Sequence, residues 1–137
     1  MVLNDEFGNI KVGIELEGHL IDGNGTIANR IDDVVNHEYN DGSIIPELSK
    51  SMFELVTPPY SDLDIAYEDL NNRLKMLKGI TDDLNLRIIP TSSLHNESPI
   101  ETRDYDRARG LRKRIILGED LRDLEHHLTG THIHVDR

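Results

Sequence analysis

Two pairs of polar residues in this sequence have the spacing of side chains that share one face of a β-strand. Glu15 and Glu17 form the first pair, and His132 and His134 form the second. Successive side chains of a strand point to opposite faces, so each pair projects to one side with Cα atoms roughly 7 Å apart. Paired carboxylates can hold Mg²⁺, which gathers substrate phosphates. The Glu15/Glu17 spacing alone also fits a solvent-facing strand.

The His132/His134 pair is compatible with more than one chemistry. A His-x-His strand occurs in zinc sites, in phosphate sites and in ordinary strands, so the pair by itself does not choose among them.

Two further carboxylates lie in the middle of the chain. Glu54 lies inside the apolar run Met52-Phe53-Glu54-Leu55-Val56, and Glu47 precedes this run in Pro46-Glu47-Leu48. A buried carboxylate needs a partner, because an unpaired buried charge costs several kcal/mol. Glu54 is therefore either a site residue or an exposed residue of an edge strand. Glu47 is either a second ligand or part of a turn.

Basic residues concentrate between Arg103 and Arg114, where six of the 15 lysines and arginines occur in twelve positions. Such a run can bind phosphate or carboxylate groups. It is also typical of the solvated face of a helix that pairs with nearby acids such as Asp104 and Asp106. The role of the Arg103–Arg114 run is not determined by the sequence.

Strands are predicted around these residues from their alternating pattern. In residues 11–21, Val12, Ile14, Leu16 and Leu20 alternate with polar residues, which predicts a strand with one face in the core. A tight turn is expected at 22–25. The remaining elements expected in the first half are a short helix at 29–37 and strands at 43–48 and 52–57.

The second half is expected to contain the longest helix. Ser61 is a suitable N-cap, with Asp64 three residues later, and apolar residues then recur at helical spacing as far as Leu84. Further elements are expected as a strand at 86–89, helices at 103–117 and 121–128, and a strand at 131–135. This mixture predicts an α+β fold in a single domain of residues 1–137.

Composition excludes several classes of protein. The chain has 137 residues, 26 acidic and 15 basic residues, a net charge of −11 and no cysteine. Such negative charge repels a nucleic-acid backbone, so no nucleic-acid partner is expected. The lack of cysteine excludes disulfides and thiolate zinc sites. No apolar run is long enough to span a bilayer and no signal peptide is evident, so we expect a cytoplasmic protein without a membrane partner.

Three segments, taken in order, resemble one enzyme family. Residues 13–23, with Glu15-Leu16-Glu17, resemble the opening strand and turn of the glutamate–cysteine ligase-like carboxylate–amine ligases, the amidoligases of glutamine synthetase-like fold. Residues 46–58 resemble the second acidic motif of that family. Residues 129–136, with His132 and His134, resemble its Gly-x-His-x-His-Val strand.

This resemblance implies a mostly antiparallel curved sheet that is lined with acidic residues and backed by helices. It implies an ATP- and Mg²⁺-dependent reaction in which ATP phosphorylates a carboxylate and an amine attacks the acyl phosphate to form an amide. The implied Mg²⁺ ligands are Glu15, Glu17, Glu47, Glu54 and His132, and His134 is implied to lie near the nucleotide phosphates.

The family's enzymes are two to three times longer than this chain, so the resemblance implies the N-terminal portion of a catalytic domain. We expect little or no turnover from this portion alone, and self-association through uncovered sheet edges. Two alternatives are kept: a non-catalytic oligomerising or cation-binding module, and a zinc-dependent hydrolase that uses His132 and His134. The carboxylate and amine that would be joined are not specified.

Overall fold

A computed structural model describes residues 10–94, 99–103 and 128–136 of the chain. Residues 104–117 of the expected helix at 103–117, most of the helix at 121–128 and all of the basic run after Arg103 lie outside these ranges. Leu128, the last residue of the second expected helix, instead forms a β-bridge with Ser93.

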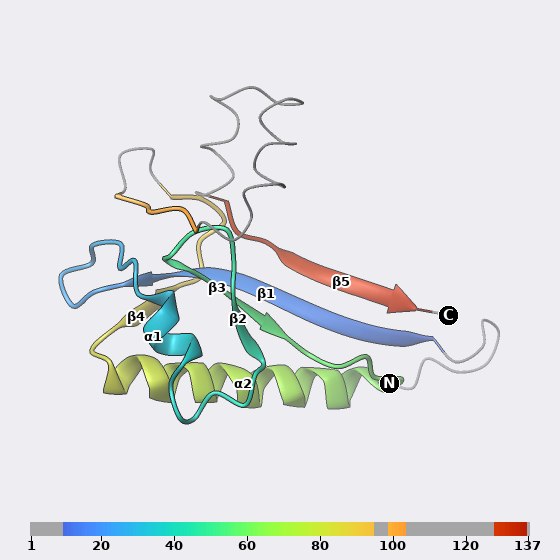
Figure 1. Cartoon of the computed structure of the whole chain (residues 1–137). Coiled ribbons are helices and arrows are strands. Elements are labelled where there is room, and N and C mark those ends of the chain that lie inside the picture. Colours follow the sequence, from blue (N-terminus) through green and yellow to red (C-terminus); the bar gives the residue numbers. More distant parts are fainter. Residues whose placement is uncertain (1–9, 95–98, 104–127, 137) are drawn as a thin grey trace, which may run out of the picture.

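The described residues form an α+β fold around one five-stranded antiparallel sheet, which confirms the predicted fold class (Figure 1). Its strands are β1 (Lys11–Ile21), β2 (Ile44–Pro46), β3 (Met52–Val56), β4 (Arg87–Ile89) and β5 (Thr131–Asp136). The spatial order is β2-β3-β1-β4, and β5 pairs with β1 beside β4. The 11-residue β1 is therefore the central strand, with β3 on one side and β4 and β5 in succession along the other.

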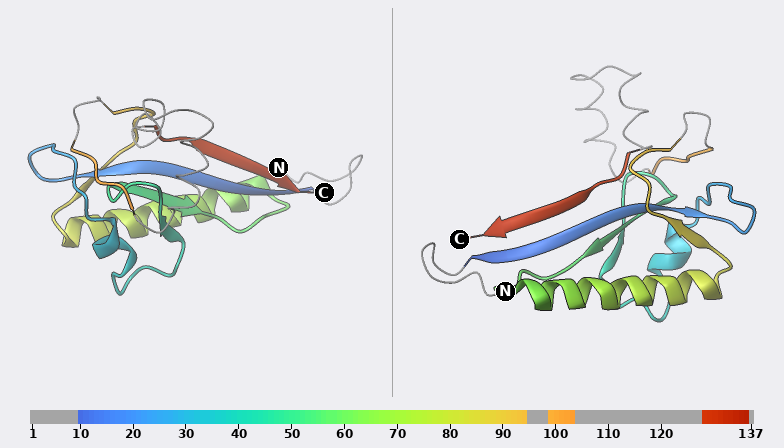
Figure 2. Two further views of the ribbon diagram at one scale, coloured as in Figure 1. Left: turned by 45° about the horizontal axis from the view of Figure 1, so that its top comes forward. Right: turned by 180° about the vertical axis from the view of Figure 1, so that it is seen from behind.

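Two helices pack against the sheet. The short α1 (Ile31–Val35) contacts β2, and the 21-residue α2 (Leu63–Asp83) contacts β1, β3 and β4. The two views in Figure 2 show α2 running along one face of the sheet. None of the helices in the described ranges is long and apolar enough to cross a membrane.

The core lies between this face and the helices. Val12, Leu20, Phe53 and Leu55 occupy alternate positions of β1 and β3, and all four are buried. Their neighbours in the core are Ile31, Val34, Ile44, Leu77, Ile80 and Leu86. Alternation then requires the intervening residues of β1 and β3 to lie on the opposite face, which carries the acidic residues.

The close contact between the Phe53 ring of β3 and the backbone of β1 depends on Gly18. A Cβ at this position would lie 2.5 Å from the Phe53 ring and 3.2 Å from the Ile89 carbonyl oxygen. Because Phe53 is itself buried, its ring has little room to move away. Gly18 therefore lets the aromatic ring pack directly over the central strand.

The start of α2 differs from the sequence-based expectation. The N-cap is Asp62 rather than Ser61, and its side chain accepts a hydrogen bond from the Asp64 backbone N–H at 2.9 Å. Both residue types are good caps, and the geometry selects the carboxylate, which is favoured at the positive end of the helix dipole. Within α2, Ala66 is buried and Tyr67 is largely exposed, because successive side chains of a helix point about 100° apart.

Candidate functional site

The sheet face opposite the helices gathers the polar residues predicted from the sequence. The strand register pairs Glu15 with His132 and with Val56, and it pairs Glu17 with Glu54. Residues directly opposite in an antiparallel pair lie on the same face. Carboxylates of β1 and β3 and imidazoles of β5 therefore share one surface, although β1 and β5 are over 110 residues apart in the sequence. We call this group the acidic cluster; its members are Glu15, Glu17, Glu47, Glu54, His132 and His134.

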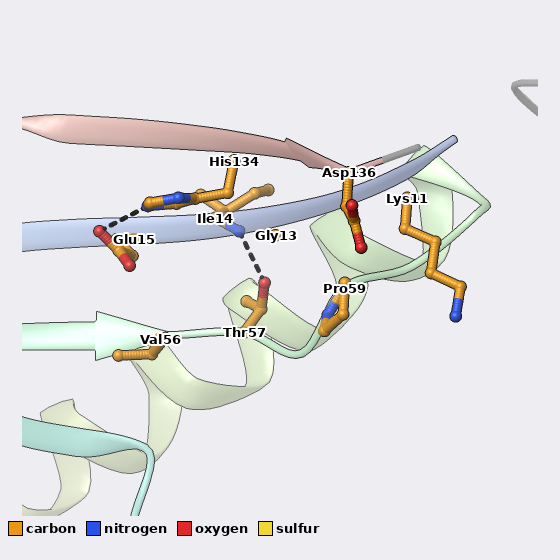
Figure 3. A pocket seen from close by; sticks show the side chains of 9 residues that line it. All are labelled: Lys11, Gly13, Ile14, Glu15, Val56, Thr57, Pro59, His134 and Asp136. Carbon is orange, nitrogen blue, oxygen red and sulfur yellow. Dashed lines mark hydrogen bonds and ion pairs between the residues drawn. The ribbon is translucent and has the colours of Figure 1, made fainter. Parts of the chain in front are cut away.

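Glu15 joins β1 to both histidines of β5. Its Oε2 atom lies 2.9 Å from Nε2 of His134 and 3.2 Å from Nδ1 of His132. The hydrogen bond with His134, followed by the one with His132, keeps the pKa of Glu15 below its usual range despite partial burial. Glu15 is thus held as a carboxylate with both imidazoles directed at it (Figure 3 shows the His134 contact).

Glu17 is fixed by the segment that leads into β5. Its Oε2 atom accepts a hydrogen bond from the Gly130 backbone N–H at 2.8 Å, and its Oε1 atom lies 3.8 Å from Nδ1 of His132. Burial raises the pKa of Glu17, and the Gly130 hydrogen bond opposes that rise. Glu17 therefore combines a fixed orientation with a partly desolvated carboxyl group.

Glu54 is the most strongly perturbed member of the cluster. It is only 8% exposed, and β3 lies between β2 and β1, so the alternative of an exposed edge-strand residue is wrong. Burial, with the nearby carboxylates of Glu47 and Glu15, raises the pKa of Glu54 to about 8. Like charges held close together in a partly dry site cannot all ionise without cost, so Glu54 retains its proton.

Glu47 lies just after β2, in the connection to β3. Its Oε2 atom accepts a hydrogen bond from the Leu48 backbone N–H at 2.9 Å, and its carboxyl group hydrogen-bonds with that of Glu54. Glu47 therefore takes part in the local turn and also lies with the other carboxylates of the acidic cluster, while its role as a metal ligand stays a prediction.

The donors of this cluster suit a hard divalent cation. Mg²⁺ prefers carboxylate oxygens, and a cation would offset the repulsion that keeps Glu54 protonated. In the described part of the chain, however, no three His, Asp or Glu side chains are placed so that they could hold one ion together. The side chains of the cluster therefore suit a hard cation in their chemistry, and binding one ion together would require them to reorient.

His19, the next residue on this face of β1, is completely buried. Its Nδ1 atom lies 3.0 Å from the Ser51 hydroxyl, which in turn lies 3.0 Å from the Ser49 hydroxyl. The alternation of β1 places His19 on the same face as Glu15 and Glu17. This buried polar network joins β1 to the turn that leads into β3.

At the opposite end of β1, the same face contains a hollow of about 240 Å³ that sequence reasoning missed (Figure 3). Its floor is Gly13, which occupies a position of the alternating pattern where a side chain would otherwise project. The only sequence signal was this glycine two residues before Glu15. The residues that line the hollow are Lys11, Gly13, Ile14, Glu15, Val56, Thr57, Pro59, His134 and Asp136.

Arg103 is the one described residue of the basic run, and it lies apart from the cluster. Its guanidinium group forms an ion pair with Asp32 of α1. At this position the run therefore joins a loop to a helix through a distant acid, Asp32. Asp104 and Asp106, the neighbouring acids that the sequence suggested, lie outside the described ranges, as do the other residues of the run.

Two solved ligases share this fold. A glutamate–cysteine ligase from Francisella tularensis, in complex with AMP, has a TM-score of 0.63 at 22% identity over 93% of this chain. A bifunctional glutathione synthetase from Pasteurella multocida has a TM-score of 0.60 at 22% identity over 92% of this chain. The chain covers 27% and 17% of those two proteins, respectively. No protein-family model and no curated protein matches the sequence. The acidic cluster therefore lies on a sheet that is similar in fold to part of two ligases.

Proposed function

We propose that this chain is the N-terminal part of an ATP- and Mg²⁺-dependent carboxylate–amine ligase that resembles the glutamate–cysteine ligases. The observation that carries the proposal is the acidic cluster, in which four carboxylates and two imidazoles meet on one sheet face. The similarity in fold to two solved ligases supports it.

In this proposal the carboxylates and His132 hold Mg²⁺, and His134 binds the nucleotide phosphates. Glu15 orients both imidazoles through its contacts of 2.9 and 3.2 Å. Glu17, fixed by Gly130, supplies a second rigid oxygen donor on the same strand. The cation would neutralise phosphate charge and align the γ-phosphoryl group with the substrate carboxylate. The protein's part is positioning and electrostatic stabilisation, which dominate phosphoryl transfer.

Because the chain covers about a quarter or less of the ligases it resembles, we propose that it binds Mg·ATP and has little turnover alone. The carboxylate and amine substrates would then be small molecules chosen by residues outside this chain. We further propose a cytoplasmic protein that self-associates. Ile133 and Val135 of β5 are 67% and 64% exposed, and such apolar surface favours association.

Binding of Mg·ATP by isothermal titration calorimetry tests the proposal. Wild type is expected to bind, and both Glu15→Gln and Glu17→Gln should weaken binding by about tenfold or more, since each removes a charged ligand. Glu68→Gln is the matched control, because Glu68 is exposed on α2, outside the cluster. Unchanged affinity in the Glu15 and Glu17 variants, or absence of wild-type binding, would overturn the assignment.

The second candidate function is a zinc-dependent hydrolase, because His132 and His134 both contact Glu15. Two imidazoles and one carboxylate are a common zinc ligand set. Elemental analysis of the purified protein separates the two functions. One equivalent of tightly held zinc that is lost in His132→Ala would favour the hydrolase, and loosely held magnesium would favour the ligase. Cation binding without nucleotide binding would instead indicate the non-catalytic module.

A further inference from the structure

One edge of the sheet is open in the part of the chain that the structure describes. β5 pairs with β1 along one side, and no strand of the described ranges pairs with its other side. All six residues of β5 are exposed, and the ribbon views show the strand along the rim of the sheet, apart from α2 (Figure 1 and Figure 2). An exposed strand edge is a template to which another strand can be added.

The backbone of β5 directs the hydrogen-bonding groups of every second residue to this open side. The Glu17 N–H donates to the Gly130 carbonyl oxygen at 3.0 Å, which fixes the alternation along the antiparallel pair. The even-numbered residues of β5, in step with Gly130, exchange hydrogen bonds with β1. Ile133 and Val135 therefore turn their N–H and C=O groups outward, to the open edge.

Ile133 and Val135 also place apolar side chains at this edge. They lie opposite Ile14 and Val12 of β1, on the face of the sheet that packs against the helices. On that face α2 contacts β1, β3 and β4, and the side chains of Ile133 and Val135 are left largely exposed. A strand that covers this edge must therefore offer both backbone hydrogen bonds and apolar side chains.

The sequence of β5 meets both needs when the strand is paired with itself. In an antiparallel second copy whose two-fold axis passes through His134, Ile133 of one copy lies opposite Val135 of the other. Each such pair exchanges two hydrogen bonds through the outward groups. The same register places His132 opposite Asp136 of the second copy. Apolar residues then meet on one face of the sheet, and imidazole meets carboxylate on the other.

Charge favours this register over the next one. A shift of two residues moves the axis to Ile133, sets His132 opposite His134 and sets Asp136 opposite Gly130, so the imidazole–carboxylate pairs are lost. The net charge of −11 opposes the association of two copies as a whole. We therefore expect a weak dimer that becomes tighter as added salt screens this repulsion.

We propose that β5 pairs with β5 of a second copy about a two-fold axis at His134 and joins two sheets into one. This inference rests on the self-association included in the proposed function, and it adds the surface and the register. Because the axis is perpendicular to the sheet, the helices of both copies lie on one face. Both acidic clusters lie on the other face, side by side on one continuous surface.

Sedimentation velocity over a range of protein concentrations tests the edge. Pairing through one short strand buries less area than a standard interface, so the Kd is expected at about 10 µM or above. Val135→Lys places a charge among apolar side chains. Val135→Pro removes the outward N–H without removing a hydrogen bond to β1. Each variant should weaken the dimer by about tenfold or more.

Two controls accompany these variants. Val135→Thr keeps the N–H and the branched shape of the side chain, and it should change the dimer little. Ile65→Lys adds the same charge at an isoleucine of α2 that is also exposed, and it should associate as wild type does. Thermal unfolding verifies that each variant folds.

Cysteine cross-linking tests the register, because the chain has no cysteine of its own. The axis sets position 134 of the two copies opposite each other in a non-hydrogen-bonded pair, with Cα atoms roughly 4.5 Å apart, which a disulfide can span. Under mild oxidation, His134→Cys should form a linked dimer about tenfold or more faster than Ile65→Cys, the exposed control on α2. Faster linkage through Ile133→Cys than through His134→Cys would indicate the shifted register and overturn this one.

The remaining outcomes separate the edge from the proposed function. A dimer that neither Val135→Lys nor Val135→Pro weakens would overturn pairing through β5 and leave self-association standing. Wild type that stays monomeric at every concentration would overturn both. Neither result bears on the ligase function, which Mg·ATP calorimetry of the same protein decides separately.

Discussion

Replacing Glu54 with glutamine removes one ionisable carboxyl group from the acidic cluster while keeping the size of the side chain. Glu54 is 8% exposed, and burial with the nearby carboxylates of Glu47 and Glu15 raises its pKa to about 8. An ordinary glutamate of the unfolded chain has a pKa near 4.5. Folded protein therefore binds one more proton than unfolded protein between these two pH values, and its free energy of unfolding falls as the pH rises through this window.

The size of this effect follows from the same values. A carboxyl group whose pKa moves from 4.5 to about 8 contributes at most about 5 kcal/mol of pH-dependent stability. Water reaches the cluster from the open face of the sheet, so we expect about 2 kcal/mol. Glu54→Gln should therefore be about 2 kcal/mol more stable than wild type at pH 8, or about 6 °C higher in Tm, with the gain vanishing toward pH 4.5.

Urea and thermal unfolding of both proteins at pH 5, 6.5 and 8, in EDTA, measure the difference directly. Other titrating groups, such as Glu17 with its raised pKa, contribute to both proteins; Glu15 interacts directly with Glu54, so the difference between the two proteins measures Glu54 together with its effect on Glu15. Glu68→Gln makes the same exchange at an exposed helix position and should leave the pH dependence unchanged. Parallel pH profiles for wild type and Glu54→Gln would refute the assignment of a protonated Glu54.

Unfolding of the same two proteins with added Mg²⁺ tests whether Glu54 belongs to the proposed cation site. A ligand that binds only the folded protein adds RT ln(1 + [L]/Kd), about 1.4 kcal/mol at ten times the Kd. MgCl₂ should therefore stabilise wild type at pH 8 more than it stabilises Glu54→Gln, because the variant has lost one charged ligand. Equal stabilisation of the two proteins would show that Mg²⁺ does not use Glu54.

Two predictions test the fold that positions the cluster. Gly18→Ala should destabilise the protein by about 1–3 kcal/mol in urea unfolding, because its Cβ would overlap the buried Phe53 ring. Gly79→Ala is the control and should be neutral or stabilising. A Gly18→Ala variant as stable as wild type would contradict this packing. Asp62→Ala should lower the free energy of unfolding through loss of the helix cap, and Ser61→Ala should change it little. If Ser61→Ala were instead the more destabilising of the two substitutions, Ser61 rather than Asp62 would be the helix cap.

Local pattern determined the elements and the faces of β1. The alternation of Val12, Ile14 and Leu16 with Glu15 and Glu17 predicted both the strand and the side to which the acids point, because side-chain direction in a strand depends only on position along it. The same rule located the strand that contains His132 and His134. The start of α2 was off by one residue, since Ser61 and Asp62 are both competent caps and only the folded geometry selects between them.

The tertiary structure alone decided which strands meet. Nothing near Glu15 in sequence specifies that His132, 117 residues later, is its neighbour, or that Glu54 lies on an inner strand beside Glu17. Such pairing depends on long-range contacts and on the helices that cover one face of the sheet. The local pattern of residues carries no information about either. The raised pKa of Glu54 and the hollow over Gly13 both arise from that pairing. The Glu15-Leu16-Glu17 motif thus supplied two carboxylates, and the sheet assembled the site around them.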